Sequence, residues 1–402
     1  MRIVFLSPEL PEAGDPAGAR VRSLAGRDGV DVLIALTGAR PSAGQDVVWD
    51  GARVIAVEDP AVRGADVAIA LHWRACAQLF SIAARRTVLL VDAFAHERLG
   101  TWEADRVPAA LAHDLPVDVL AGGDWVVRAF ARSRPGVRAR LARAAVDDAL
   151  FRPAAPAGER AADAPLRVVV DDRWRPDPAV SDAGETLAAH GVLPLALPPA
   201  ATPAERAEVL RGADVLLLLD PAGGDGAVVR EAMACGAVPV VLPAGGQADV
   251  VVDDVSGLVV EPDDHRGTAR RLERLAGDPA LLTRLRAGAL EAAAAWPGEA
   301  AAGDELHAAL TELVAEPMPA DAAWPTRVMG DAIAQSAILS NEIHTLGAAL
   351  RSVENGDAFK TGTKVMETWH SPRLARVRKL AAPVARRMRP RLDGAGGAGP
   401  TP

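Results

Sequence analysis

Short apolar runs alternate with polar or small-residue stretches along most of the chain. Runs such as residues 3–6, 32–36 and 88–91 contain no polar position, which is typical of parallel strands that are buried on both faces of a sheet. The stretches between them carry turn residues or the spacing of amphipathic helices. This alternation predicts an α/β fold built on parallel, doubly wound sheets.

A second series of apolar runs begins after residues 154–165, whose sequence AAPAGERAADAP has the composition of a linker. The pattern therefore predicts two Rossmann-like domains, the first over residues 1–150 and the second over residues 151–315. Two such domains joined by a linker leave a cleft between them, and ligands are expected there.

The most informative stretch is VVREAMACGAVPVVLPAGGQADVVVDDVSGLVV, residues 228–260. It follows the buried run ADVLLLLD and predicts a small-residue helix between two strands, with Glu231 on the first turn of the helix. Parallel α/β proteins bind ligands at the carboxyl ends of strands and near helix N-termini. We therefore expect a ligand site around Glu231.

Three stretches resemble GT-B glycosyltransferases of family 4, which are retaining enzymes that use nucleotide sugars. They are residues 1–25, residues 144–153 (AAVDDALFRP) and residues 230–264, of which the last is the most specific. The resemblance covers about residues 1–315. It implies two Rossmann-like domains that face a cleft, with the last helix, after Trp296, crossing back to the first domain.

The resemblance also implies a donor site in the second domain. Glu231 matches the glutamate that accepts hydrogen bonds from the ribose hydroxyls of the nucleotide. Gly226 and the backbone N–H groups at the start of the same helix would face the diphosphate or the sugar. The family's second glutamate, which contacts the donor sugar, is replaced here by Gly223, so Asp225 or Asp220 is expected to substitute for it.

The diphosphate is expected to meet arginine, because lysine is absent before Lys360. Arg173 and Arg175, in VVVDDRWRPDPAVSD, lie where the family places an arginine and a lysine. The alternative is a pair of solvated loop arginines.

In the first domain, Asp92 and His96 occupy the place where the family contacts the reacting sugar. The alternative for Asp92 is a helix-capping role. Gly14 and Gly18 match the family's flexible loop near the donor phosphate and the acceptor, although such a segment is also an ordinary turn. For His72 we expect a packing or hydrogen-bonding role.

The implied reaction is glycosyl transfer with retention, from a nucleoside-diphosphate sugar to the hydroxyl of a glycan or lipid-linked acceptor in cell-envelope or polysaccharide biosynthesis. We expect no metal and no cofactor besides the donor substrate, since arginine and helix ends can carry the charge of the diphosphate. The alternative is a GT-B relative without turnover that acts as a binding or scaffolding protein. An oxidoreductase is disfavoured because no G-x-G-x-x-G follows the first strand.

Length, composition and net charge limit the classes of partner and the location that we expect. The chain has 402 residues and a net charge of −9, which argues against nucleic acid as the main partner. No apolar run is long enough to span a bilayer, and the N-terminus lacks the pattern of a signal peptide. We therefore expect a cytoplasmic protein. Cys76 and Cys235 are expected to be buried structural residues.

The tail, residues 316–402, lies outside the resemblance and is predicted to be helical and basic, with a disordered end. Residues 326–352 carry an apolar stripe that predicts either packing on the body or a homodimer. Residues 371–392 concentrate arginine and lysine without an acidic residue, which predicts contact with an anionic membrane surface at the inner face. A solvated basic tail is the alternative.

Overall fold

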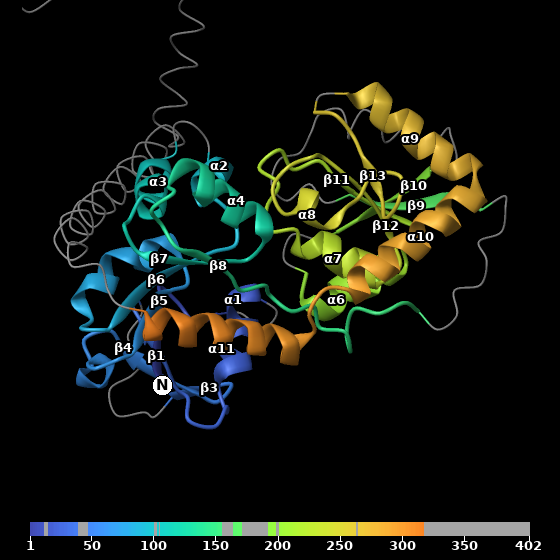
Figure 1. Cartoon of the computed structure of the whole chain (residues 1–402). Coiled ribbons are helices and arrows are strands. Elements are labelled where there is room, and N and C mark those ends of the chain that lie inside the picture. Colours follow the sequence, from blue (N-terminus) through green and yellow to red (C-terminus); the bar gives the residue numbers. More distant parts are fainter. Residues whose placement is uncertain are drawn as a thin grey trace, which may run out of the picture. The chain divides into compact units, whose positions relative to one another are not determined.

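The computed structural model describes residues 1–11, 15–38, 47–99, 103, 105–154, 164–170, 192–197, 201–262 and 264–316. These residues form two α/β domains, each built around its own sheet (Figure 1). The two tail segments, 326–352 and 371–392, lie outside the described residues.

The first sheet has eight strands in the order β3-β4-β2-β1-β5-β6-β7-β8. All pairs are parallel except that of β3 with β4. The order reverses at β1, which lies between β2 and β5, and ligands bind beyond the carboxyl ends of strands at such a point. The strands are β1 (Arg2–Ser7), β2 (Asp31–Leu36), β3 (Val47–Trp49), β4 (Ala52–Ala56), β5 (Val67–Ala70), β6 (Arg86–Val91), β7 (Asp118–Ala121) and β8 (Ala139–Leu141).

Both faces of the first sheet are buried, which explains the uninterrupted apolar runs. Helix α1 begins where Asp15 accepts a hydrogen bond from the N–H of Ala17, with Pro16 in its first turn. The helical segments of this domain are α1 (Pro16–Leu24), η1 (Pro60–Val62), η2 (Trp73–Ser81), α2 (Ala95–Arg98), α3 (Arg106–His113) and α4 (Asp124–Ser133).

The second sheet is parallel throughout, with the strand order β10-β9-β11-β12-β13. Its strands are β9 (Leu166–Val170), β10 (Val192–Ala196), β11 (Val215–Leu218), β12 (Val238–Val241) and β13 (Leu258–Val259). The order reverses at β9 and β11, so a second ligand-binding edge lies beyond the carboxyl end of β11.

Six helices lie in the described part of this half of the chain. Helix α6 begins with a reciprocal capping box between Thr202 and Glu205. The last helix buries Leu306, Leu310 and Leu313 in the core of the first domain. The helices are α6 (Pro203–Arg211), α7 (Ala227–Ala234), α8 (Gln247–Val250), α9 (His265–Gly277), α10 (Pro279–Ala294) and α11 (Glu299–Ala315).

The structure confirms the predicted fold of two α/β domains. The pattern did not predict the short edge strands β3 and β8, because three residues are too few to carry a period. The domain boundaries at 150 and 315 stay predictions, and Phe151 already packs in the core of the second domain.

Among the described residues, no helix combines the length and apolarity that crossing a bilayer requires. Cys76 and Cys235 are buried and free, and burial raises the pKa of the Cys235 thiol to about 12.

Candidate functional site

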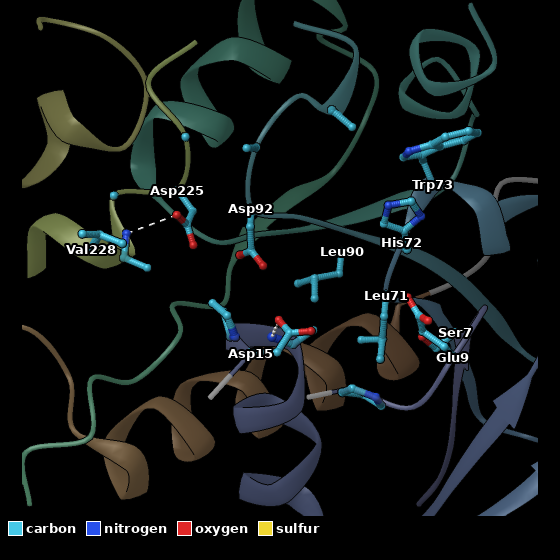
Figure 2. Close-up of a pocket in the computed structure, with 18 of the residues that line it drawn as sticks. Ser7, Glu9, Asp15, Leu71, His72, Trp73, Leu90, Asp92, Asp225 and Val228 are labelled. Carbon is cyan, nitrogen blue, oxygen red and sulfur yellow. Dashed lines mark hydrogen bonds between the residues drawn. The ribbon is translucent and has the colours of Figure 1, made fainter. Parts of the chain in front are cut away.

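A cavity of about 1030 Å³ is lined by residues from both halves of the chain (Figure 2). Its wall includes the segment after β1, the ends of β5 and β6, and, from the second domain, the start of α6 and the turn between β11 and α7. These are strand ends and helix starts, where both sheets are expected to bind ligands. Six carboxylates are part of the lining, namely Glu9, Asp15, Asp92, Asp220, Asp225 and Glu231.

Asp92 directly follows β6 and forms a bidentate ion pair with Arg20 of α1. The carboxylate oxygens Oδ1 and Oδ2 accept hydrogen bonds from Nη2 and Nη1 of Arg20 at 2.5 and 2.9 Å. Arg20 is only 3% exposed, and its Nε donates to the carbonyl of Ala142 at 2.9 Å. A side chain at Gly122 would overlap this pair, since its Cβ would lie 2.0 Å from Asp92 Oδ1. Asp92 is therefore fixed at the cavity wall by its neighbours.

The sequence analysis assigns no role to Arg20, which lies on α1. Its spacing indicates burial, because Ala17, Val21 and Leu24 form the buried face of α1 and Arg20 falls on that face. An arginine among buried apolar positions requires a partner. That partner is a carboxylate 72 residues further along the chain, which the local pattern does not reveal.

Asp15 adds a second carboxylate close to Asp92. Burial raises the pKa of Asp15, while the N–H of Ala17 lowers it, and the carboxylates of Asp92 and Asp225 raise it further. Figure 2 shows Asp15, Asp92 and Asp225 around the same part of the cavity. Carboxylates from both halves of the chain are thus within electrostatic reach of one another.

Glu231 lies on α7 and forms a bidentate ion pair with Arg206 of α6. Its oxygens Oε1 and Oε2 accept hydrogen bonds from Nη2 and Nε of Arg206 at 2.8 and 3.0 Å. Both side chains line the cavity and are mostly buried. The helix begins at Ala227, so Glu231 lies in the second turn and the prediction of the first turn is wrong. The prediction failed because the Gly-rich segment before the helix gives no sharp boundary signal.

The turn that precedes α7 packs backbone against backbone on the turn after β12. Gly223 has a φ of +71°, and a Cβ there would lie 2.2 Å from the carbonyl carbon of Ala244. Gly246 faces the same turn, since its Cβ would lie 2.4 Å from the carbonyl carbon of Asp225. Only glycine fits this contact. The glutamate that the resemblance expects at position 223 is therefore incompatible with the backbone of this turn.

Asp225 and Gly226 form the start of α7. Asp225 Oδ1 accepts a hydrogen bond from the N–H of Ala227 at 3.1 Å, and Gly226 is the N-cap with a φ of +73°. Both residues line the cavity, as does Asp220, whose Oδ1 accepts from the N–H of Ala222. The structure thus brings Asp225, Gly226 and Glu231 together, as the sequence predicts.

The histidines of the first domain divide into lining and packing residues. His72 lines the cavity, and its Nδ1 accepts a hydrogen bond from the N–H of Arg74 at 3.1 Å, as expected of a hydrogen-bonding residue. Burial lowers the pKa of His72 and of His113 to about 4. His96 packs its ring against Phe94 and His113 and is not among the lining residues. The structure therefore brings Asp92, but not His96, to the cavity wall.

Three of the other predicted residues lie outside the described part of the chain, namely Gly14, Arg173 and Arg175. Gly18 is described, and it is buried within α1, so the prediction that it belongs to a flexible loop is wrong. Within the described ranges, no three His, Cys, Asp or Glu side chains are grouped so that they could hold a metal ion.

Comparison with solved structures identifies the architecture. A sucrose-phosphate synthase from Thermosynechococcus elongatus superposes with a TM-score of 0.60 at 18% identity, over 78% of this chain and 99% of that one. HepE of Anabaena, solved in complex with UDP and glucose, gives a TM-score of 0.56 at 15% identity, over 78% and 100% of the two chains. The fold is GT-B.

The GT-B fold is accompanied by a family match in the second domain. Residues 200–292 match the model of glycosyl transferases group 1. A D-inositol 3-phosphate glycosyltransferase of Catenulispora acidiphila is 40% identical over 99 residues, which are 25% of this chain and 23% of that protein. A protein of the same name from Streptomyces bingchenggensis is 37% identical over 112 residues, 27% and 25% of the two chains. The chain thus matches about a quarter of the length of these curated relatives.

Proposed function

We propose that the protein is a glycosyltransferase of family 4 that moves a sugar from a nucleoside-diphosphate sugar to an acceptor hydroxyl with retention. The observation that carries this proposal is Glu231, a carboxylate held by Arg206 in the cavity wall, one turn into the helix that a Gly-rich segment opens. The GT-B fold and the family match over residues 200–292 support it.

In this proposal Glu231 accepts hydrogen bonds from the ribose hydroxyls. A carboxylate has about four acceptor positions, so the bidentate pair with Arg206 fixes its orientation without excluding a second set of donors. Hydrogen bonds to a charged acceptor are about twice as strong as those between neutral groups. Arg206 therefore acts as the residue that orients Glu231 toward the ribose.

The diphosphate would lie at the N-terminus of α7. The segment from Gly223 to Ala227 lines the cavity without a bulky side chain, so its backbone can approach a ligand closely. The positive end of the helix dipole favours an anion there. We assign Arg173 and Arg175 to the same diphosphate on the basis of the sequence, together with Gly14 on the loop near the donor phosphate.

Asp225 and Asp92 are the carboxylates that we assign to the sugar. Asp225 takes the role of the glutamate that Gly223 cannot provide. Asp92, fixed by Arg20, would stabilise the positive charge that develops at the anomeric carbon as the diphosphate departs. His96 would act from behind the wall and shape the pocket through its contact with His113, which lines the cavity.

The acceptor side rests on the sequence alone. We propose a glycan or lipid-linked acceptor in cell-envelope or polysaccharide biosynthesis, with residues 371–392 on an anionic membrane surface at the inner face. Residues 326–352 would form a homodimer if they do not pack on the body. No metal or further cofactor is required in this scheme.

A second candidate function is a GT-B relative without turnover that acts as a binding or scaffolding protein. The acidic lining favours it, because six carboxylates surround the cavity and the lining arginines Arg74 and Arg206 are both in ion pairs, which leaves little positive charge to stabilise a departing diphosphate.

The test is calorimetric titration of the purified protein with UDP, GDP and ADP, in parallel with Glu231→Ala. Loss of hydrogen bonds to a charged group costs about 1.5–3 kcal/mol, which is an affinity loss of about 10- to 150-fold. The matched control is Glu305→Ala, because Glu305 also forms a bidentate pair with an arginine, Arg143, and does not line the cavity.

We expect one nucleotide to bind, Glu231→Ala to lose it and Glu305→Ala to keep it. Absence of binding by the folded wild-type protein would overturn the donor site. Binding without hydrolysis or transfer from the corresponding nucleotide sugars would favour the second candidate.

A further inference from the structure

Arg230 is a buried arginine in the first turn of α7. It is 4% exposed, and its guanidinium lies over the ring of Trp296, with 4.4 Å between the guanidinium carbon and the ring centroid. Its Nη1 donates to the carbonyl of Asp225 at 2.7 Å, and its Nε has no hydrogen-bond partner among the described residues. A Cβ built on Gly226 would lie 3.3 Å from Nη1. The charge is thus held against the turn that lines the cavity.

Burying such a cation without an ion pair is costly. Among the described residues, no carboxylate lies within ion-pair distance of Arg230. Burial lowers the pKa of its guanidinium, while the carboxylates of Asp225 and Asp92 act in the opposite direction. An arginine remains protonated in proteins in spite of such burial. The structure therefore keeps a positive charge in place although its immediate surroundings do not neutralise it.

The other arginines at the described wall of the cavity are neutralised. Arg206 pairs with Glu231, Arg74 with Asp105, and Arg20, behind the wall, with Asp92. Arg230 differs from them in being adjacent to the turn and in having no carboxylate partner among the described residues. A dianionic group at the start of α7 would complete its electrostatic environment.

We propose that Arg230 is a positioning residue for the diphosphate of the donor, an inference that rests on the function proposed above. It holds the carbonyl of Asp225, so that the N–H groups at the start of α7 point toward the cavity. It also supplies a buried positive charge within electrostatic reach of Asp225, Asp92 and Glu231, carboxylates that would otherwise repel the ligand. A charge in this position acts with little screening by salt, because it is removed from water.

The stacking on Trp296 explains how an unpaired guanidinium is tolerated. A cation over an indole ring is attracted by the ring's quadrupole, more strongly when both groups are desolvated. Trp296 is itself fixed, since its Nε1 donates to the carbonyl of Ala144 at 2.8 Å and the guanidinium of Arg143 lies over its ring, 5.3 Å from the centroid. Arg230 is therefore held by a rigid support and not by a carboxylate that would cancel its charge.

The test compares the affinities of UDP and uridine for the wild-type protein and for Arg230→Leu, by calorimetry. Whichever nucleotide the protein binds replaces UDP, together with its nucleoside. Leucine keeps an apolar contact with Trp296 and removes the charge. We expect the affinity for UDP to fall on the order of five-fold or more, the affinity for uridine to stay unchanged, and the melting temperature to stay equal or rise, because an uncompensated charge has been removed.

Two further variants separate the charge from the packing. Arg230→Lys keeps the charge, and we expect it to retain most of the preference for UDP over uridine. Arg286→Leu is the matched control, because Arg286 also lies in the second domain, bonds the carbonyl of Gly236 and pairs with Asp214, and does not line the cavity. Its preference for UDP is expected to equal that of the wild type.

An unchanged ratio of UDP to uridine affinity in Arg230→Leu would overturn the proposal. If the melting temperature is also lower, the role of Arg230 is purely structural. If Arg230→Leu does not fold, Arg230→Met serves in its place. Absence of nucleotide binding by the wild type would instead remove the donor site and this inference together.

Discussion

The tight contact at Gly223 makes a quantitative prediction for Gly223→Ala. The substitution has two costs. The φ of +71° lies in the left-handed region, where a residue with a Cβ is disfavoured by about 1–2 kcal/mol. The new methyl would also lie 2.2 Å from the carbonyl carbon of Ala244, so two backbone segments must separate, which adds about 1–3 kcal/mol. We expect the free energy of unfolding to fall by about 3 kcal/mol.

Gly236→Ala is the control that isolates the second cost. Gly236 has a φ of +85°, and the nearest atoms to its Cβ would be side-chain atoms of Arg286 and Leu290 at 3.9 Å, an ordinary contact distance. Both glycines lie in the second domain, so the same unfolding transition reports on both variants. The control should lose only the conformational part, about 1–2 kcal/mol.

Urea denaturation followed by circular dichroism measures both losses, provided that the slope against denaturant is the same for the variants. The reasoning is refuted if Gly223→Ala and Gly236→Ala are equally destabilised, because the contact with Ala244 would then contribute nothing. Gly223→Glu carries the same prediction into function. Introducing the glutamate that the resemblance expects should weaken nucleotide binding, since it displaces the turn that opens α7.

Two further predictions concern stability in the first domain. Arg20→Leu leaves Asp92 without its partner in a largely buried site and should lower the free energy of unfolding by about 3 kcal/mol. Arg22→Leu breaks an exposed pair with Asp50 at 3.4 Å and should lower it by at most about 1 kcal/mol. Equal urea midpoints for the two variants would contradict this prediction. His113 has a pKa of about 4 in the folded protein and about 6.5 in the unfolded protein. As the pH falls, the unfolded state therefore binds the proton before the folded state does. The contribution of neutral His113 to the free energy of unfolding is complete above pH 6.5 and is lost as the pH falls toward 4. His113→Gln should remove on the order of 3 kcal/mol of this pH dependence, and thermal denaturation between pH 4 and 7 that shows the same slope for both proteins would count against it.

Most of the fold follows from the sequence because both sheets are buried on both faces. A strand such as β11 has no polar position over Val215–Leu218, so its type and approximate limits can be predicted from the apolar run alone. The edge strands β3 and β8 are different, since each has three partly exposed or exposed residues. Their pairing depends on neighbours that are distant in the sequence, and no local period specifies it.

The candidate site is predictable only where a motif is local. Asp225, Gly226 and Glu231 fall within seven residues of one another on a turn and a helix, and the structure brings them to one wall. Asp92 follows a strand end and lines the same cavity, where parallel sheets are expected to bind ligands. The partners that fix these residues were not predictable, because Arg206 is 25 residues from Glu231 and Arg20 is 72 residues from Asp92, and ion pairs across elements leave no periodic trace.

The substitution at position 223 also changes what the missing glutamate implies about function. Taken as a sequence difference, it indicates a donor site that has lost a ligand. In the structure, Gly223 belongs to a contact between two turns in which Gly245 and Gly246 also lack room for a Cβ. These glycines keep the two turns together, so position 223 cannot carry the glutamate whether or not the donor site is used. The same turn is held from below by Arg230, through the carbonyl of Asp225. The absence of a glutamate at position 223 therefore follows from the packing of this turn and is not by itself a sign of a decayed donor site.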